Sequence, residues 1–408
     1  MMSGIGIIKI DMNWHKYILL FTIIDSLFLP YFPLMSVSFS VLTVALWIMF
    51  NLKSVFKGKE GTGVFFVIMM MLISTLLNPL YTGNVVVQTS FSTAIKRFIQ
   101  YSISLCLLLY YKRSFSQSKV DINKILFFFV IYVFGFAVLY FLFPYQYAVL
   151  KLAISPVDNH TRRYLLGTVT YRFNYLWTDP NNIAYAISGV ETYLLMKGKL
   201  NIIKKYIVVG CSAFIVVASS SAGGIISFVL ANALLLMYMI IFKSNYCIRA
   251  KASSLMVAIL SIIAIFFVII RADVTSNVIE PMLTKFQNRM TSYQTGANIT
   301  GGRWDDLKGA IVMLNPLMLV IGSGQEGFTT EIGHIYIIGM YGFLAYISIM
   351  KLIFGKINNQ KTWDYVWILP FFIGFTMNIG IGEYKWLAIL ILLLSYCRYG
   401  EEKADLPC

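Results

Sequence analysis

The chain has 408 residues, of which 58% are hydrophobic and only 12% are charged. Soluble domains carry about a quarter charged residues, and a large part of their surface must be polar. This composition excludes a water-soluble globular protein and indicates an integral membrane protein. The formal net charge of +15 would suit a nucleic-acid partner, but the positions of the basic residues argue against one.

Apolar runs recur along the chain at the length of transmembrane helices, about 17–25 residues. They are apolar on every face, as in 255–270, and lack the alternation of a β-barrel strand. We therefore expect an all-α integral membrane protein, with residues 1–408 forming a single polytopic membrane domain of about twelve transmembrane helices. The expected spans are 17–33, 34–52, 63–78, 92–111, 124–144, 182–197, 203–219, 222–242, 252–271, 333–351, 363–379 and 384–398.

The first run is expected to be an anchor and not a cleavable signal peptide. It follows Lys9 and Lys16, is followed by Pro30 and Pro33 without a small-residue cleavage site, and leads directly into a second span.

The basic residues alternate from one connection to the next. With the N-terminus inside, every second loop is short and basic, and these loops hold 21 of the 33 lysines and arginines. This is the pattern of the positive-inside rule. It places both termini in the cytoplasm and explains the net charge without a nucleic acid. The two long connections, about 145–181 and 272–332, then form large loops on the outer, periplasmic side.

The second loop is predicted to hold a short amphipathic helix. Trp304, Leu307, Ile311 and Leu314 lie on one helical face, and such a helix would lie along the membrane surface.

Arginine and lysine are distributed unequally between the two sides. The 21 cytoplasmic basic residues comprise 18 lysines and 3 arginines, whereas the other 12 comprise 5 lysines and 7 arginines. Arginine binds phosphate with two parallel hydrogen bonds and keeps its charge when partly desolvated. The bias predicts a site for a phosphate-bearing lipid on the outer side. Chance, or pairing with headgroups and acidic side chains, is the alternative.

Two local clusters precede the second loop, one at the end of the first loop and one in a later turn. In the first, Arg172 precedes Asp179-Pro180-Asn181, which has the residues of a helix start. Helix capping accounts for the Asp-Pro-Asn motif, but it gives no structural reason for Arg172. In the second, the small residues of 219–224 form a tight turn between two spans, and close helix packing is the favoured interpretation.

Two further clusters follow in the second loop. Gly301 and Gly302 precede Arg303, so an anion could bind there, or Arg303 could simply pair with Asp305. Gly322-Ser323-Gly324 is followed by Glu331 and His334. His334 could act as a general base oriented by Glu331, or it could be a hydrogen-bonded residue at the interface.

Other kinds of site lack a signal. The chain shows no metal-ligand cluster, phosphate-binding loop or dinucleotide fingerprint, and its five cysteines form no metal motif. We therefore expect no metal and no cofactor. Glu191 and Asp25 are acidic residues inside expected spans, where ionisable groups are costly and often functional.

The four clusters, in this order, resemble the family of bacterial O-antigen polymerases and O-antigen ligases. These are membrane glycosyltransferases of about twelve spans that act on undecaprenyl-diphosphate-linked glycans at the periplasmic face. The matching residues are Arg172 with Asp179-Pro180-Asn181, Ser221-Ala222-Gly223-Gly224, Gly302-Arg303-Trp304, and Gly322 and Gly324 with His334. The chain departs from the family at Ala222, where arginine is common, at Trp304, which directly follows Arg303, and at Ile335, where ligases commonly have Asn or Ser. The last two departures favour a polymerase over a ligase.

The resemblance implies a polymerase that transfers a growing undecaprenyl-diphosphate-linked glycan onto a lipid-linked repeat unit, in the bacterial inner membrane. The catalytic residues would be His334, Glu331 and Arg303. The substrate-binding residues would be Arg172, Arg289, Arg162, Arg163, Tyr171, Trp177 and Trp304. The arginines would bind or guide the diphosphate, and the aromatic rings would stack on sugars. The implied partners are the lipid-linked oligosaccharide, membrane lipids and a chain-length regulator protein.

Three alternatives remain open at this level. A ligase would pass the glycan to lipid A core, and only the acceptor distinguishes it from a polymerase. A lipid-linked oligosaccharide flippase would place ionisable residues along a central path. A membrane scaffold would need no site at all.

Overall fold

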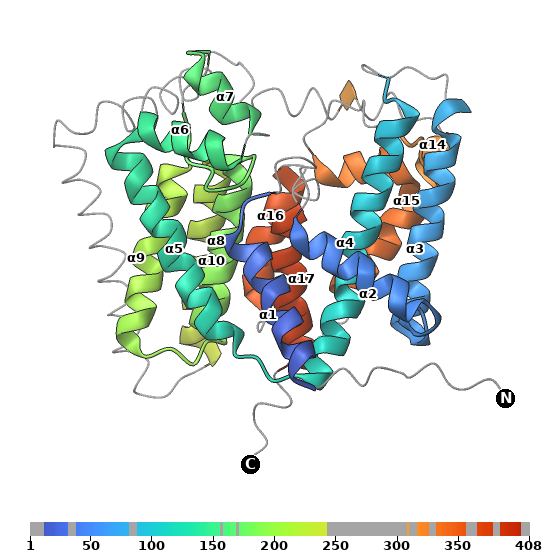
Figure 1. Ribbon diagram of the computed structural model, residues 1–408. Helices are drawn as coiled ribbons and strands as arrows, with labels where there is room; N and C mark the ends of the chain where they lie inside the picture. The colour runs from blue at the N-terminus through green and yellow to red at the C-terminus, as the bar shows by residue number, and fades with distance from the viewer. Residues whose placement is uncertain are drawn as a thin grey trace.

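The computed structural model describes residues 12–31, 38–80, 88–155, 158–168, 171–242, 308–309, 316–325, 332–355, 365–377 and 384–400. In these ranges the chain forms helices and no β-strand (Figure 1), so the predicted all-α class is confirmed for them. The elements are α1 (Met12–Phe28), α2 (Phe39–Val55), α3 (Gly58–Leu77), η1 (Asn78–Leu80), α4 (Phe91–Gln117), α5 (Ile122–Leu142), α6 (Pro144–Ile154), α7 (Asn159–Leu165), α8 (Pro180–Met196), α9 (Ile202–Ala218), α10 (Ala222–Phe242), α14 (Pro316–Ile321), α15 (Gly333–Phe354), α16 (Leu369–Met377) and α17 (Tyr384–Tyr399).

Each predicted span that lies in the described ranges contains a helix, and the span 252–271 lies outside them. In the part of the chain that the structure describes, three helices are long and apolar enough to cross a membrane: Gly58–Leu80, Ile122–Leu142 and Gly333–Phe354. Shorter apolar helices are Phe39–Leu52, Ala222–Tyr238 and Tyr365–Met377. These features support a membrane protein. The number of spans and the sides of the loops and termini stay predictions.

Two groups of helices flank a central set. In Figure 1, α5 to α10 pack on one side, α3, α4, α14 and α15 pack on the other, and α1, α16 and α17 lie between them. α17 packs against α4, while α8 packs against α9, α10 and α16. α8 and α17 are buried over almost their whole length. Both helices contribute to a hydrophobic core that also includes residues of α1, α3, α4, α5, α9, α15 and α16.

The junction between α1 and α2 shows how helix ends are satisfied away from water. Pro30 cannot donate a backbone hydrogen bond, and α1 ends at Phe28, before the predicted end of the span at residue 33. The buried Asp25 carboxylate accepts from the Ser40 amide (2.6 Å) at the start of α2. The buried Lys385 ammonium donates to the Asp25 carbonyl (3.1 Å) at the end of α1. A negative charge at a helix start and a positive charge at a helix end are both stabilising. Asp25 thus has a structural role.

Candidate functional site

Arg172 joins two of the clusters that the sequence singles out. It lies in the irregular segment 171–179 that leads into α8, and it is half-buried. Its Nε donates to the Ser219 carbonyl (3.0 Å), and its Nη2 donates to Oδ1 of Asn181 (2.8 Å). These two bonds orient the guanidinium. An oriented arginine of this kind is suited to bind an anion in a fixed geometry.

The start of α8 is built as the sequence predicts. Asp179 is the N-cap residue, and its side chain accepts from the Asn181 amide (2.7 Å). Pro180 occupies the first helical position, where its missing N–H costs nothing. This cap leaves the Asn181 side chain to hold Arg172. The helix-start prediction is confirmed, and the contact with Arg172 is an addition to it.

A buried ion pair that the sequence analysis missed holds the segment before α8. Lys151 on α6 and Asp158 before α7 are 1% and 0% exposed, and their Nζ and Oδ2 atoms lie 2.5 Å apart. Lys151 also donates to Oδ1 of Asn174 and to the Trp177 carbonyl (2.8 Å), while Asn174 donates to Asp158 (3.0 Å). A buried pair of this kind is tolerated when hydrogen bonds satisfy its remaining atoms. The network ties the segment just after Arg172 to α6 and to the start of α7.

Asp158 stays ionised in spite of its burial. Burial alone would raise its pKa, but the Lys151 ammonium and hydrogen bonds from Lys151 and Thr161 outweigh that effect, and the pKa lies below its usual value. Thr161 donates to the carboxylate through its hydroxyl (2.5 Å) and its amide (3.1 Å). The carboxylate thereby also caps the start of α7.

His160 is a second residue that the sequence analysis did not select. It lies on α7 with its ring stacked over Tyr171 (centroids 6.1 Å apart). Burial lowers the pKa of His160, and the nearby positive charge of Arg172 lowers it further. The imidazole is therefore neutral at pH 7, and the local positive charge comes from the arginines.

The structure places Tyr171 and Trp177 inside the protein. Tyr171 is 6% exposed, and its ring stacks on Tyr164 with centroids 4.5 Å apart. Trp177 is 0% exposed and packs against Tyr175. Rings enclosed in this way cannot stack on a sugar in this conformation, so the predicted sugar-stacking role is replaced by packing. Both residues support the segment that carries Arg172.

Arg162 and Arg163 lie on α7 with exposed side chains. Both arginines lie in the last turn of this helix. Positive side chains are stabilised there because the C-terminus of a helix carries a partial negative charge. Together with Arg172 they make this end of the bundle basic.

The small residues of the 219–224 turn allow α10 to approach α8 closely. A Cβ added at Gly224 would lie 2.4 Å from the Cβ of Ala184, and one added at Gly223 would lie 2.1 Å from the Tyr185 hydroxyl. These distances are shorter than any real contact, so only glycine fits at both positions. The structure thus agrees with close packing as the reason for the two glycines. The turn contributes its Ser219 carbonyl to Arg172.

His334 is held by two hydroxyl groups. Its Nε2 lies 3.0 Å from Oγ1 of Thr376 on α16, and its Nδ1 lies 3.1 Å from the Tyr346 hydroxyl. Its ring also meets the ring of Phe375 edge-on, with centroids 4.5 Å apart. The predicted partner Glu331 lies outside the described residues. To act as a base, the imidazole would have to exchange one of these hydroxyls for a substrate hydroxyl.

His334 and Arg172 lie towards the same end of α8. α16 runs antiparallel to α8, since a Cβ on Gly374 would contact Tyr185 and one on Gly189 would contact Phe371. Thr376 follows Gly374 and is therefore near the start of α8, where Asn181 holds Arg172. The two predicted residues thus come from distant parts of the sequence to one end of the bundle.

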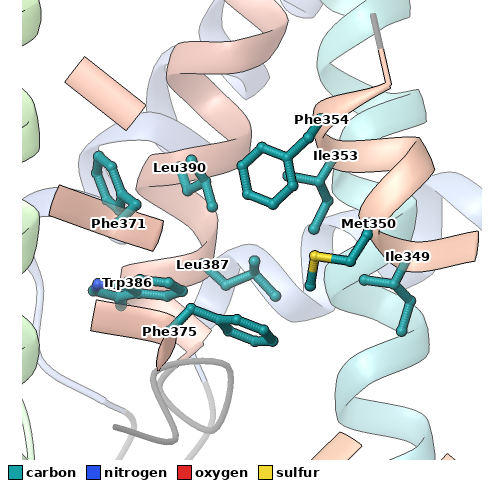
Figure 2. A pocket seen from close by; sticks show the side chains of 9 residues that line it. All are labelled: Ile349, Met350, Ile353, Phe354, Phe371, Phe375, Trp386, Leu387 and Leu390. Carbon is teal, nitrogen blue, oxygen red and sulfur yellow. The ribbon is translucent and has the colours of Figure 1, made fainter. Parts of the chain in front are cut away.

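Phe375 also lines a small apolar pocket between α15, α16 and α17, and Figure 2 shows Phe354, Phe371 and Trp386 among the other lining residues. Its volume is about 10 Å³, which is about the space of one water molecule. It is therefore a gap in the apolar packing and is too small for a sugar, a phosphate or a lipid chain.

The Gly322-Ser323-Gly324 motif has a structural explanation. Gly322 and Gly342 both have positive φ (+86° and +85°), and each added Cβ would strike the backbone of the other segment. Two chain segments cross here in direct backbone contact, and α15 breaks at Gly342. The Ser323 amide donates to the Gly339 carbonyl (3.0 Å), which satisfies a carbonyl before the break. This crossing requires glycine.

The remaining predicted residues, Arg289, Arg303, Trp304 and Glu331, lie outside the described residues, as does most of the predicted amphipathic helix. Among the described residues, no group of three or more His, Cys, Asp or Glu side chains could hold a metal ion.

The fold defines an all-helical protein with helices of membrane-spanning length, and the site is a basic region at one end of the bundle. Comparisons with protein-family models, with curated proteins and with solved structures found no match.

We predict that Lys151→Met destabilises the protein by about 3–5 kcal/mol, because it leaves the Asp158 carboxylate buried without its cation. Unfolding in detergent, followed by circular dichroism against denaturant, measures the change. The double variant Lys151→Met with Asp158→Asn should recover much of the loss, since no buried charge then remains.

This stabilisation should also depend on pH. The folded-state pKa of Asp158 lies below its unfolded value of about 3.9. The contribution is therefore fully present above that value and is lost as the pH falls through the folded-state pKa. Equal stability of wild type and Lys151→Met at neutral pH would contradict the role of the pair.

Proposed function

We propose that the chain is a polymerase of bacterial surface polysaccharide of the O-antigen type. It would transfer a growing undecaprenyl-diphosphate-linked glycan onto a lipid-linked repeat unit, in the inner membrane and at its periplasmic face. The proposal combines the resemblance of the sequence clusters with the basic region around Arg172.

The observation that carries the proposal is the fixed orientation of Arg172. Hydrogen bonds to the Ser219 carbonyl and the Asn181 side chain orient its guanidinium, and the buried Lys151–Asp158 pair holds the segment on which it lies. Arg162 and Arg163 add exposed positive charge on α7. A diphosphate at the membrane surface carries negative charge that such arginines can bind.

The proposed reaction is a glycosyl transfer. A hydroxyl of the acceptor sugar attacks the anomeric carbon of the donor, a new carbon–oxygen bond forms, and the bond to the diphosphate breaks. Arg172 and Arg303 would stabilise the charge that develops on the leaving diphosphate. His334 would take the proton of the attacking hydroxyl, with Glu331 orienting it. Arg289 would be a further ligand of the diphosphate.

A flippase is the alternative of another class, and Glu191 is the observation that bears on it. Glu191 is completely buried on α8, and its Oε2 accepts from Thr192 (3.2 Å) and from Asn232 on α10 (3.4 Å). A carboxyl inside the bundle is the kind of group a transporter uses. Asp25 and Lys385 are also buried, but they cap helix ends. The basic region around Arg172 therefore favours the polymerase.

We predict that Arg172→Ala prevents glycan elongation. Cells that lack the protein but make the lipid-linked repeat would be complemented with wild type and variants, and their surface glycans separated on a gel. Wild type should give a ladder, and Arg172→Ala should give single-repeat product, reduced in polymer by about 100-fold or more. Arg172→Lys should also lose most polymer, because an ammonium group cannot replace a two-pronged guanidinium contact.

Arg113→Ala is the matched control, because Arg113 contacts Asn51 (3.0 Å) and Ser54 (3.3 Å) in a different part of the bundle. It should give a full ladder at the same protein level. A full ladder from Arg172→Ala would reject the site. If cells without the protein display no repeat at all, not even a single one, the ligase or flippase replaces the polymerase.

A second prediction concerns His334. His334→Ala should lower polymer formation by about 100-fold, the usual effect of losing a general base. Thr376→Val, which removes one hydroxyl partner of the ring, should cause a smaller loss. The same gel assay at matched protein level measures both. Normal ladders from His334→Ala would show that the imidazole has only a structural role at the start of α15.

A further inference from the structure

The helix α6 has an unusual distribution of side chains. Phe143 just before it, and Tyr145, Val149 and Leu150 on it, are exposed by 53%, 61%, 47% and 48%. Its one charged residue, Lys151, points inward to Asp158. The exposed face of α6 is therefore apolar apart from Gln146, and the charge of the helix lies on the buried face. This is the reverse of a helix on the surface of a soluble protein.

This apolar face continues the surface of a membrane-spanning helix. α5 is long and apolar enough to cross a membrane, and Phe128, Leu139 and Leu142 are exposed along it. α6 starts two residues after α5 ends, and Figure 1 shows it at the end of α5. The exposed apolar surface thus runs from α5 onto α6. Such a continuous patch is unfavourable in water.

The charge beside this face fits a lipid surface. α7 packs against α6 and carries the exposed Arg162 and Arg163. An apolar helical face with neighbouring basic residues is typical of segments that lie in the interfacial layer of a membrane, where phosphate groups attract arginine.

We propose that the exposed face of α6 lies in the phospholipid interface at the end of α5, with Arg162 and Arg163 at the level of the headgroup phosphates. The partner is the phospholipid itself. This inference does not need the proposed enzymatic function, nor the side of the membrane on which α6 lies.

Docking of α6 would set the depth of Arg172. Lys151 binds Asn174 and the Trp177 carbonyl, and the Tyr147 hydroxyl of α6 donates to the Tyr175 carbonyl (3.1 Å). These bonds fix the segment 171–179 on α6. The guanidinium of Arg172 is therefore held at a constant depth relative to the lipid phosphates, which is where a lipid-linked anion presents its charge.

The test places a spin label at Val149 in a cysteine-free variant of the full chain, reconstituted in nanodiscs of phosphatidylethanolamine and phosphatidylglycerol. Power saturation compares the accessibility of the label to oxygen, which concentrates in lipid, and to a water-soluble nickel chelate. Labels at Phe128 on α5 and at the exposed Lys119 between α4 and α5 serve as lipid and water controls. The label at Val149 should resemble the one at Phe128.

Two results would overturn the proposal. A label at Val149 that is more accessible to nickel than to oxygen, as expected at Lys119, would place α6 in water. Dipolar broadening between labels would show that a second copy of the chain covers the face. If the labelled protein does not fold, Leu150→Trp provides a second measurement: quenching of the new tryptophan by brominated phospholipid is expected, and absence of additional quenching relative to wild type would reject lipid contact.

Discussion

The buried pair between Lys151 and Asp158 is the interaction on which the candidate site depends. Without it, the segment 171–179 would keep few polar anchors to α6, and the Asp158 carboxylate would lose its compensating charge. The pair joins α6, the start of α7 and the segment that carries Arg172. Its burial also leaves no charged side chain on the outward face of α6, which is apolar apart from Gln146. One ion pair thus holds the segment that carries Arg172 and keeps the charge of Lys151 away from the exposed face of α6.

The second constraint is that backbone groups away from water must find partners inside the protein. Asp25 accepts from a backbone amide at the start of α2, and Lys385 donates to a backbone carbonyl at the end of α1. Where Gly322 and Gly342 cross, a backbone hydrogen bond satisfies the carbonyl before the break in α15. These residues look like candidates for chemistry in a sequence, since they are charged or lie in glycine motifs. Their hydrogen bonds instead show a structural role, because they satisfy backbone groups at helix ends and at the break in α15. The contacts of Arg172 with Ser219 and Asn181 explain its orientation, and the exposed Arg162 and Arg163 lie on the neighbouring helix α7.

Much of the fold could be predicted because apolar helices leave a strong signal in sequence. The helix start at Asp179 was also predictable, since its capping chemistry is local. The roles of Tyr171 and Trp177 were not, because an aromatic residue in a loop can face a ligand or the core, and only tertiary packing decides. The Lys151–Asp158 pair was missed for the same reason. A single lysine in a loop predicted to be exposed gives no sign that its partner and its burial come from another helix.

The central claim is that the arginine region binds a lipid diphosphate and releases it during glycosyl transfer. The most direct measurement supplies the purified protein in nanodiscs with an undecaprenyl-diphosphate-linked repeat and follows the products by mass spectrometry. We expect glycans of two or more repeats, with one molecule of undecaprenyl diphosphate released for each new glycosidic bond. Wild-type protein that binds the lipid-linked repeat but forms no longer glycan and releases no diphosphate would contradict it.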